Sequence, residues 1–371
     1  MTAESNQSLE TLDVPCDENG ASQGIIDASV VVICFNAGDT LTGCLEALQP
    51  LQWREVVVVD NASTDDSIGA ALVQWPGVTV VRSAVNLGFA GGANLGAHHT
   101  TGSVLIFLNP DTYPETATLQ YLVNSLIDTP GVAGPLVYQQ ATQGYEAGAV
   151  VDISGIPHGL SVNDSRLPLY ITGCCLATNR SCFDLVGGFD TRYFMFVEDV
   201  EYCWQALRRG FEVSVVREAV IDHAGGAVAP GGYPAANDTE WREVSVARVL
   251  LRERNTTIML LACVPIIWLP IVLIASIIRT AAFACLLVRL GAWRSIAGLL
   301  FGLGQVVWWI PETLRRRRKP GVTKPGIMHA WARVVKRPFL LDSLGESSRV
   351  RLVGARSVGP RSSSWERAVG M

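Results

Sequence analysis

Short apolar runs recur along the first 110 residues, and each gives way to a polar turn and then to helix-like spacing. The runs are continuous rather than alternating, and they cover Ser29–Cys34, Val56–Val59, Val78–Val81 and Val104–Leu108. Continuous β-branched runs are typical of parallel strands that are buried on both faces and connected by helices. The predicted fold class is therefore α/β, with a doubly wound and mostly parallel sheet.

Polar side chains stand where these runs end: Asn36, Asp60, Asn86 and Asp111. In doubly wound sheets the ligand lies beyond the carboxyl ends of the strands. We therefore expect a polar, acidic constellation at one edge of the sheet.

The pattern weakens after the fourth run. Residues 137–169 are rich in Gly, Pro, Ser and Asp, so we expect a loop there, with regular structure resuming at Leu169. Beyond it the pattern predicts a helix over Glu198–Arg209 that Gly210 ends, strands over Phe211–Val216 and Ala219–Ile221, and a Gly/Pro-rich linker over 225–237.

Two long uncharged stretches follow. Asn255–Ile278 has 24 residues without a charge, and about 20 apolar residues of helix span a bilayer core. A second stretch covers Ser295–Pro311, and basic residues on both outer flanks favour a hairpin with cytoplasmic ends. Arg279, Arg289 and Arg294 would then lie in or beyond the membrane. Three alternatives to a membrane hairpin therefore remain: a single span with an interfacial second segment, a re-entrant pair, and a buried hairpin of a soluble protein.

These features divide the chain into five parts. The predicted division is a disordered leader (1–27), a catalytic domain (28–237), an amphipathic juxtamembrane segment (238–254), membrane segments (255–311) and a basic cytoplasmic tail (312–371). The leader is polar and acidic and lacks the pattern of a secretory signal.

Composition agrees with this division. Hydrophobic residues make up 49% of the 371 residues and charged residues only 17%, whereas a soluble domain usually has about a quarter. Disorder throughout, collagen and a disulfide-stapled miniprotein are excluded. The net charge of −5 conceals a tail of +10, with 14 Lys/Arg against 4 Asp/Glu, and a remainder of −15. Such a tail favours phosphates, either of lipid head groups or of nucleic acid, and a simply solvated tail is the alternative for Arg349–Arg367. The predicted partners are the membrane and no nucleic acid.

The chain has nine cysteines, an odd number, and no C-x-x-C pair. Several of them lie in apolar runs. We predict reduced, buried thiols and a cytoplasmic catalytic portion.

Three segments carry candidate chemistry. Asp60 and Asp111 each follow an apolar run, and a carboxylate at such a place can hold a divalent cation that bridges phosphates, although a plain turn is the alternative. The glycine-rich segment Asn86–Asn94 permits close approach of a ligand to the backbone. Three acids within Phe196–Glu201 open a helix, where they either complement its dipole or supply a general base for a sugar hydroxyl.

Taken in order and spacing, these motifs resemble inverting family 2 glycosyltransferases, most closely bacterial rhamnosyltransferase-like members that act on cell-wall or lipid-linked glycans. The resemblance covers residues 28–225 and includes Asn109-Pro-Asp111 and Gly187-Gly-Phe-Asp190. It implies a GT-A fold, a nucleotide-sugar donor such as a dTDP- or UDP-sugar, and Mg²⁺ or Mn²⁺. The C-terminal transmembrane helical segment is predicted to follow this domain.

The resemblance also implies roles on the donor side. Phe35 and Asn36 would border the nucleotide, Asp60 would bind the base or ribose, and Asn86, Gly88 and Asn94 would form the floor under the diphosphate and sugar. Asp111 matches the last acid of the D-x-D motif and would bind the metal, with Asn109 in place of the first acid. His223 matches a histidine that binds the metal or the diphosphate in some members.

On the acceptor side, Asp199 matches the catalytic base, Glu198 would orient the acceptor, and Asp190 would line the acceptor pocket. The predicted protein is a membrane-attached inverting transferase at the cytoplasmic face of the plasma membrane. It would move a sugar, with rhamnose favoured, to a lipid-linked or cell-wall polysaccharide acceptor.

Two other classes are weighed against this prediction. One is a non-catalytic membrane scaffold or glycan-binding protein, which need not retain Asp60, Asp111 and Asp199 together. The other is a nucleotidyltransferase, which usually has an early basic, glycine-rich loop, whereas the first run here ends in Phe35-Asn36-Ala37-Gly38-Asp39. The sequence carries no signal of an oligomeric state.

Overall fold

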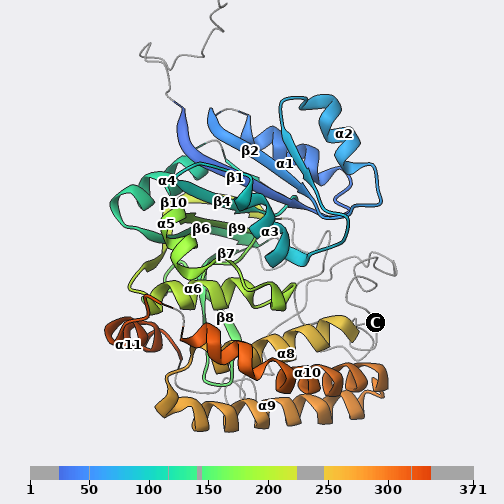
Figure 1. Ribbon diagram of the computed structural model, residues 1–371, viewed down its shortest axis with the longest axis vertical. Helices are drawn as coiled ribbons and strands as arrows, with labels where there is room; N and C mark the ends of the chain where they lie inside the picture. The colour runs from blue at the N-terminus through green and yellow to red at the C-terminus, as the bar shows by residue number, and fades with distance from the viewer. Residues whose placement is uncertain are drawn as a thin grey trace, which may run out of the picture.

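A computed structural model describes residues 25–49, 51–115, 117–139, 144–223, 246–318 and 320–335. Figure 1 shows a sheet domain at one end of the molecule and a group of long helices at the other. Outside the described residues lie the predicted leader up to residue 24, the linker over 225–237 and the end of the basic tail.

The first half of the sheet confirms the predicted pattern. Its strands pair in parallel in the order β3-β2-β1-β4, and helices connect them. Their bounds are β1 Ile26–Cys34, α1 Thr40–Leu48, β2 Trp53–Asp60, α2 Ser67–Gln74, β3 Thr79–Arg82, α3 Gly88–His98 and β4 Val104–Leu108.

The second half is mixed, because β9 runs antiparallel between β4 and β6, and β5 runs antiparallel to β10. Within the described residues the sheet has ten strands and continues β4-β9-β6-β10-β5, with β7 and β8 extending from β6. The new elements are β5 Thr112–Pro114, α4 Thr118–Asp128, β6 Gly131–Gln139, β7 Gly144–Val151, β8 Pro157–Ser161 and β9 Cys175–Asn179.

The loop predicted over 137–169 is therefore wrong, because the end of β6 and the whole of β7 and β8 lie in it. Its strands consist largely of small and glycine residues, whose hydropathy has little periodicity. These strands form because they pair with one another, for example Val137 of β6 with Glu146 of β7 and Val150 of β7 with His158 of β8. The helix predicted over Glu198–Arg209 is confirmed.

The helix at the centre of the molecule is α6 Glu198–Arg208, and Gly210 follows it with φ +88°. Before it come α5 Arg180–Val186 and the short η1 Thr191–Tyr193. The two strands predicted over 211–221 are one long strand, β10 Glu212–His223, whose register shifts between Val216 and Val220.

The C-terminal helices differ from the predicted spans. They are α8 Val246–Cys263, η2 Ile266–Trp268, α9 Leu269–Arg289, α10 Trp293–Arg317 and α11 Lys324–Ala332. A single helical span over 255–278 is wrong, because α8 ends at Cys263 and a new helix begins after Pro265. Most of α8 is buried, and hydropathy alone cannot distinguish burial against protein from contact with lipid. Within the described residues, one helical stretch, Ile266–Arg289, is long and apolar enough to cross a membrane, and only 22% of its most apolar window is buried.

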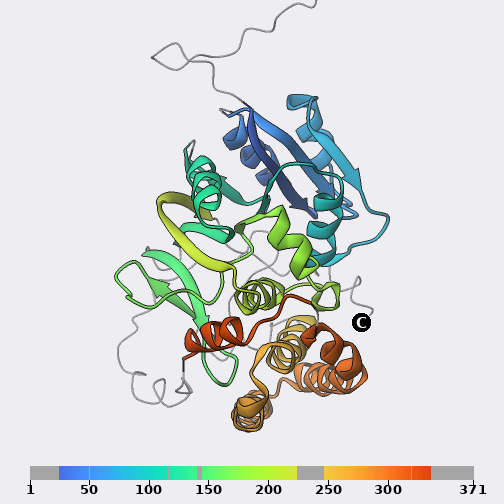
Figure 2. The ribbon, with the colours of Figure 1, turned by 60° about the vertical axis from the view of Figure 1, so that its left-hand side comes forward.

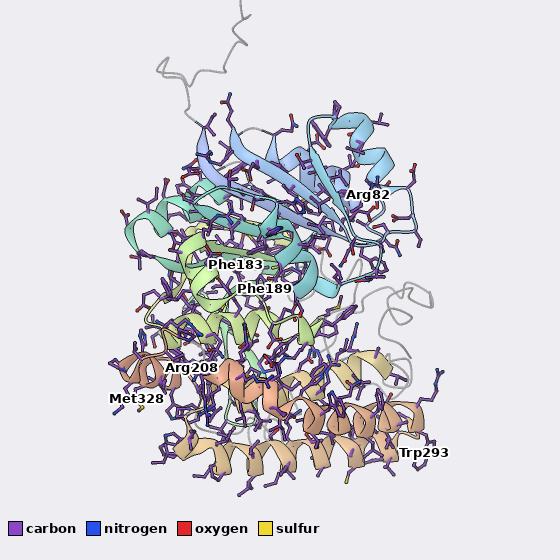
Figure 3. The ribbon with its side chains drawn as sticks, in the orientation of Figure 1. Arg82, Phe183, Phe189, Arg208, Trp293 and Met328 are labelled. Carbon is purple, nitrogen blue, oxygen red and sulfur yellow. The ribbon has the colours of Figure 1, made fainter. Side chains whose placement is uncertain are left out.

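Two apolar cores lie on the two faces of the sheet. The core between the sheet and α6 is aromatic, with Phe189 in edge contact with Phe89 and Phe107 and packed against Tyr202. Phe189 also contacts Phe183, and both are labelled in Figure 3. The described cysteines are free, and all except Cys285 are buried, which agrees with the predicted reduced thiols. Burial raises the pKa of Cys44 and of Cys174 to about 12.

Candidate active site

The loops that follow β1 and β2 are joined directly. The N–H of Thr64 donates to Oδ1 of Asn36 over 2.7 Å, and the N–H of Asn36 donates to Oγ of Ser63 over 3.1 Å. Asn36 has φ +50°, a left-handed conformation that Asn adopts more readily than most residues. Phe35 packs against Leu250 and its neighbours on α8, so the end of β1 contacts the C-terminal helices.

Asp60 lies at the end of β2 and is only 4% exposed. Its Oδ1 accepts from the N–H of Ser63 over 2.9 Å. Its Oδ2 accepts from Arg82 at the end of β3 over 2.7 Å, and the Arg82 side chain is largely exposed. The carboxylate is thus held at the strand end, beside an exposed guanidinium.

Asn61, which the sequence analysis did not select, organises the glycine-rich segment. Its Nδ2 donates to Oδ1 of Asn86 over 3.1 Å and to the carbonyl of Gly88 over 2.9 Å, while its Oδ1 accepts from the N–H of Leu87. Gly88 has φ +68°, and a Cβ at this position would lie 2.1 Å from the carbonyl oxygen of Phe194. Only glycine therefore permits this contact between the start of α3 and the loop before α6.

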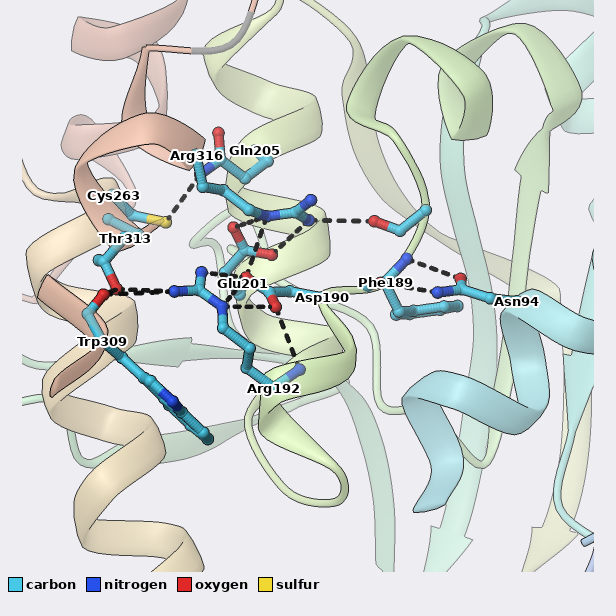
Figure 4. Close-up of polar contacts among 12 residues, drawn as sticks. Asn94, Phe189, Asp190, Arg192, Glu201, Gln205, Cys263, Trp309, Thr313 and Arg316 are labelled. Carbon is cyan, nitrogen blue, oxygen red and sulfur yellow. Dashed lines mark hydrogen bonds and ion pairs between the residues drawn. The ribbon is translucent and has the colours of Figure 1, made fainter. Parts of the chain in front are cut away.

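Asn94 and Asp190, for which the resemblance implies substrate-binding roles, both contact other residues of the chain. The side chain of Asn94 donates to the carbonyl and accepts from the N–H of Phe189, over 2.8 and 3.0 Å. The carboxylate of Asp190 pairs with Arg192 and lies 3.5 Å from Nε of Arg316 (Figure 4). Both side chains hold the turn that leads into η1.

Asp111 and His223 are 112 positions apart in the chain, and the sheet brings them together. Thr112 in β5 pairs with His223 at the end of β10, which places Nε2 of His223 3.4 Å from Oδ1 of Asp111. Among the described residues no group of three His, Cys, Asp or Glu is arranged for a metal. The carboxylate of Asp111 suits Mg²⁺ or Mn²⁺, because both ions take oxygen ligands, many of them from substrate phosphates and water. The imidazole of His223 is a better ligand for Mn²⁺ than for the harder Mg²⁺.

Asp199 lies in the first turn of α6. Its Oδ2 accepts from the N–H of Gly173 over 2.9 Å and its Oδ1 from the N–H of Val200 over 2.8 Å. Burial raises the pKa of Asp199 above its usual range, and this effect exceeds the opposing effects of those bonds and of Arg252. A carboxylate with a raised pKa is a stronger base.

A short bridge connects Asp199 to the metal-binding pair. The N–H of Gly173 contacts Asp199, while the carbonyl of the next residue, Cys174, accepts from the N–H of Asn109 over 3.0 Å and from Oγ1 of Thr112 over 3.1 Å. Asn109 and Thr112 flank Asp111. The predicted base and the residues beside the predicted metal ligand are therefore bonded to two adjacent residues of one turn.

Two further carboxylates lie close to Asp199. Burial, and then the charge of Asp199, raise the pKa of Glu198 well above its usual range, and its Oε2 has no hydrogen-bond partner among the described residues. Burial also raises the pKa of Glu146 on β7, with His223 lowering it and Asp199 raising it. Glu146 was not among the predicted site residues, because residues 137–169 were predicted to be a loop.

The loop before α6 has an unusual backbone. Phe194, Phe196 and Val197 all have φ between +61° and +73°, which is uncommon for residues with a side chain and costs of order 1–3 kcal/mol each. Asn255 of α8 holds this loop, because its Nδ2 lies within 2.8–2.9 Å of the carbonyl oxygens of Tyr193, Met195 and Phe196.

Two arginines of α8 reinforce the same loop. Nη2 of Arg254 donates to the carbonyl of Arg192 over 3.0 Å, and the guanidinium of Arg252 lies 5.2 Å above the ring of Phe196. The hydropathy pattern predicted Arg252 and Arg254 in the juxtamembrane segment and Asn255 in a membrane segment. The polar pair Arg254-Asn255 at the start of an apolar run was the signal that could have found them.

This sheet, with the candidate base and metal ligands at one edge, has the GT-A fold. Residues 29–183 match the family described as Glycosyl transferase family 2. A solved structure of GalNAc-T7 with UDP, GalNAc and Mn²⁺ shares the fold, with a TM-score of 0.50 and 18% identity, over 66% of this chain and 48% of that one.

Two relatives are similar to this chain in sequence. The chain is 28% identical, over 229 residues, to the N-acetylglucosaminyl-diphospho-decaprenol L-rhamnosyltransferase of Mycobacterium tuberculosis, which covers 52% of this chain and 75% of the relative. It is 23% identical, over 207 residues, to the low-salt glycan biosynthesis hexosyltransferase Agl10 of Haloferax volcanii, covering 50% and 64%. The chain is accordingly a glycosyltransferase with rhamnosyltransferase-like sequence.

Proposed function

We propose that this protein is a membrane-attached, inverting and metal-dependent glycosyltransferase. It transfers a sugar, with rhamnose favoured, from a nucleoside-diphosphate donor to a lipid-linked or cell-wall polysaccharide acceptor at the cytoplasmic face of the plasma membrane. The observation that carries the proposal is the bridge Gly173-Cys174, which sets Asp199 on one side and the residues flanking Asp111 on the other.

In the proposed reaction, Asp199 takes the proton of an acceptor hydroxyl. The hydroxyl oxygen forms a bond to the anomeric carbon as the bond from that carbon to the donor diphosphate breaks, so the configuration inverts. Asp111 and His223 would hold Mg²⁺ or Mn²⁺, which when bound neutralises charge on the diphosphate. Asp60 would hold the nucleoside, and Glu198 and Glu146 would contact acceptor hydroxyls.

The nature of the donor and acceptor rests on similarity. The mycobacterial relative is named for rhamnose transfer to N-acetylglucosaminyl-diphospho-decaprenol, and the C-terminal helices offer a means of staying near such a lipid. Tethering an enzyme where its acceptor is confined raises the effective concentration of the two partners. We propose a dTDP- or UDP-sugar as the donor.

The test is transfer by the purified full-length protein. Nucleoside diphosphate release is measured with a panel of dTDP- and UDP-sugars, Mg²⁺ or Mn²⁺, and N-acetylglucosaminyl-diphospho-polyprenol. Asp199→Asn should lower the turnover number by about 10²- to 10⁴-fold with donor binding retained, because only the base is lost.

The matched control is Asp184→Asn, which alters an exposed carboxylate on α5 and should leave turnover unchanged. Unchanged turnover in Asp199→Asn would remove this residue from the role of base. If the wild-type protein consumes no donor with lipid-linked acceptor present but binds glycan, the scaffold alternative replaces the enzyme.

A further inference from the structure

Helix α9 has one face turned to the protein and one face turned outward. The residues of the inner face recur at helical spacing and are buried: Val272, Ser276, Arg279 and Leu287. The residues of the outer face are exposed and apolar: Ile271, Ile274, Ile277, Ile278, Leu286 and Val288. Exposed Ile267 of η2 precedes them. A helix that leaves such an apolar face uncovered by the protein requires a partner that is not water.

Helix α10 continues this surface. Gly298 and Gly302 of α10 pack against α8, where a Cβ would lie within 3.0 Å of Val246 and Leu250. The opposite side of α10 exposes Trp293, Leu300, Phe301, Val307 and Trp308. Figures 1 and 2 show α9 and α10 side by side at the end of the molecule farthest from β1–β3. We name the exposed apolar residues of these two helices the apolar base.

The charges around the apolar base are positive except for Glu312. Arg279 is the only charged residue in 266–288, and 295–311 has none. Exposed Arg289 and Arg294 flank the turn at one end of the two helices, and exposed Arg315 and Arg318 stand at the other end of α10. Arg315 pairs with Glu312. An apolar strip with arginines at its ends matches the interface of a bilayer that contains anionic lipids.

Arg279 determines how α9 can meet that bilayer. Its Nη1 lies 2.6 Å from Oε1 of Glu253 on α8, its Nε donates to the carbonyl of Ser154 over 3.2 Å, and Thr280 donates to the same glutamate. Glu253 is 1% exposed and Arg279 is 8% exposed. If α9 left the protein to span the bilayer, Arg279 would face hydrocarbon and Glu253 would remain buried without this partner. Both changes are unfavourable.

The two ends of α9 are attached as well. Trp268, just before α9, stacks on Trp331 of α11 with ring centroids 5.9 Å apart. Leu287 near the other end packs in a small core with Val249 of α8 and Leu299 of α10. The helix is therefore attached to the protein at its start, middle and end.

We propose that the apolar base lies flat in the boundary between head groups and acyl chains of an anionic bilayer, with α9 parallel to the membrane plane rather than across it. This inference rests on the membrane attachment in the proposed function and specifies its geometry. Helix α9 has 21 residues and is about 32 Å long at 1.5 Å per residue, so it presents a long strip to the lipid. Helices α8 and α10 also contact the loop and the helix that carry Asp199, which sets the active site beside the bilayer.

The first experiment distinguishes a flat helix from a hairpin. A full-length Cys16→Ser, Cys285→Ser protein receives Arg294→Cys near the α9–α10 turn, or Val73→Cys on α2 of the sheet domain as the matched control. Sealed inverted vesicles are treated with a membrane-impermeant maleimide. A flat α9 leaves both cysteines on the outside, so both are labelled equally. Labelling of Arg294→Cys only after the vesicles are opened, with Val73→Cys labelled throughout, would overturn the proposal in favour of a hairpin.

The second experiment tests the lipid as the partner of the apolar base. The purified protein is sedimented with vesicles of phosphatidylcholine and phosphatidylglycerol. Ile274→Glu and Trp308→Glu should each lower the partition coefficient about tenfold or more, since each removes a large apolar side chain from the lipid. Val73→Glu, at an apolar residue elsewhere that is as exposed as Trp308 and more exposed than Ile274, should not lower it. Vesicle binding unaffected by the two variants, or a dimer that they dissociate without vesicle binding, would overturn the proposal.

The same variants separate this inference from the proposed function. Transfer to an acceptor dispersed in detergent needs no vesicle, so Ile274→Glu and Trp308→Glu should retain it. A wild-type protein that binds vesicles by the apolar base but transfers no sugar would contradict the proposed function alone.

Discussion

Two parts of the active site are supported over very different distances along the chain. At the strand ends, Asn36, Asp60 and Asn61 are held by partners 22 to 28 positions away. The loop before Asp199 is held by Asn255 from 59 to 62 positions away, and Glu201 of the same helix by Arg316 from 115 positions away. The strand-end part of the site thus depends on the sheet domain, whereas the part that bears the base depends on the C-terminal helices.

This difference has a physical reason. The ends of neighbouring parallel strands meet without outside help, because register sets Cys34 opposite Asp60. The loop before α6 has three residues in left-handed conformations and would relax if it were alone. Interactions from α8 and α10 oppose that relaxation, so the C-terminal helices also shape the catalytic end of α6.

The largest effect should come from removing the buried ion pair between α10 and α6. Arg316 lies 2.8 Å from Oε2 of Glu201, and the two side chains are 5% and 0% exposed. Arg316→Ala leaves the glutamate buried without its cation, and we expect a loss of about 3–5 kcal/mol in the free energy of unfolding. Urea denaturation in mild detergent measures it.

The neighbouring Arg315→Ala is the matched control, because Arg315 forms an exposed pair with Glu312. Exposed pairs contribute about 0–1 kcal/mol, so its stability should stay close to wild type. Equal losses in the free energy of unfolding of Arg316→Ala and Arg315→Ala would show that the part of the site bearing the base does not depend on the buried pair between α10 and α6.

Asn255→Ala should reduce the turnover number by about 10- to 100-fold, since a small displacement of a catalytic group can have an effect of this size. The KM for the donor should change little, because the strand ends do not rely on Asn255. Steady-state kinetics with varied donor separates the two constants. Asn255→Asp should not restore turnover, because a carboxylate cannot donate to three carbonyl oxygens.

Thr257→Ala serves as the control on the same helix, since Thr257 bonds only within α8 to the carbonyl of Glu253. A rise in donor KM with turnover preserved in Asn255→Ala would show that α8 supports the donor side instead.

Asp60→Asn tests the opposite part of the site. It retains the shape of the side chain and removes the charge, so we expect about a tenfold higher donor KM with turnover nearly unchanged. Asp66→Asn, an exposed carboxylate in the same loop, is the control. Isothermal titration with the nucleoside diphosphate gives the same comparison without catalysis, and equal affinity for wild type and Asp60→Asn would exclude Asp60 from donor binding.

The smallest effect concerns pH. The positive charge of Arg252 lowers the pKa of Asp199, so Arg252→Gln should raise it further. Because the base acts when deprotonated, activity is lost as pH falls through that pKa, and the acid limb of the kcat/KM profile should move to higher pH. Arg217→Gln, an exposed change on β10, should leave the limb in place. A downward movement in Arg252→Gln would contradict the assignment.

Local pattern was sufficient for the first half of the sheet and for α6. There an apolar run, a turn and a helix follow one another within some thirty residues, so a single stretch of sequence contains what forms them. The same pattern brought attention to Asp60, Asp111 and Asp199. It could not find Asn61 or Glu146, because their positions depend on side-chain bonding and strand pairing rather than on periodicity.

By itself, the sequence determined the α/β class, the order of the motifs and the presence of apolar C-terminal stretches, since these follow from residue type and spacing. Only the tertiary structure decided that His223 lies beside Asp111, that Asn255 holds the loop before Asp199, and that Arg279 faces Glu253. Each of these contacts joins residues far apart in the chain. Hydropathy records how apolar a helix is and not which neighbour covers it, so only packing could show which side of α9 is left for the lipid.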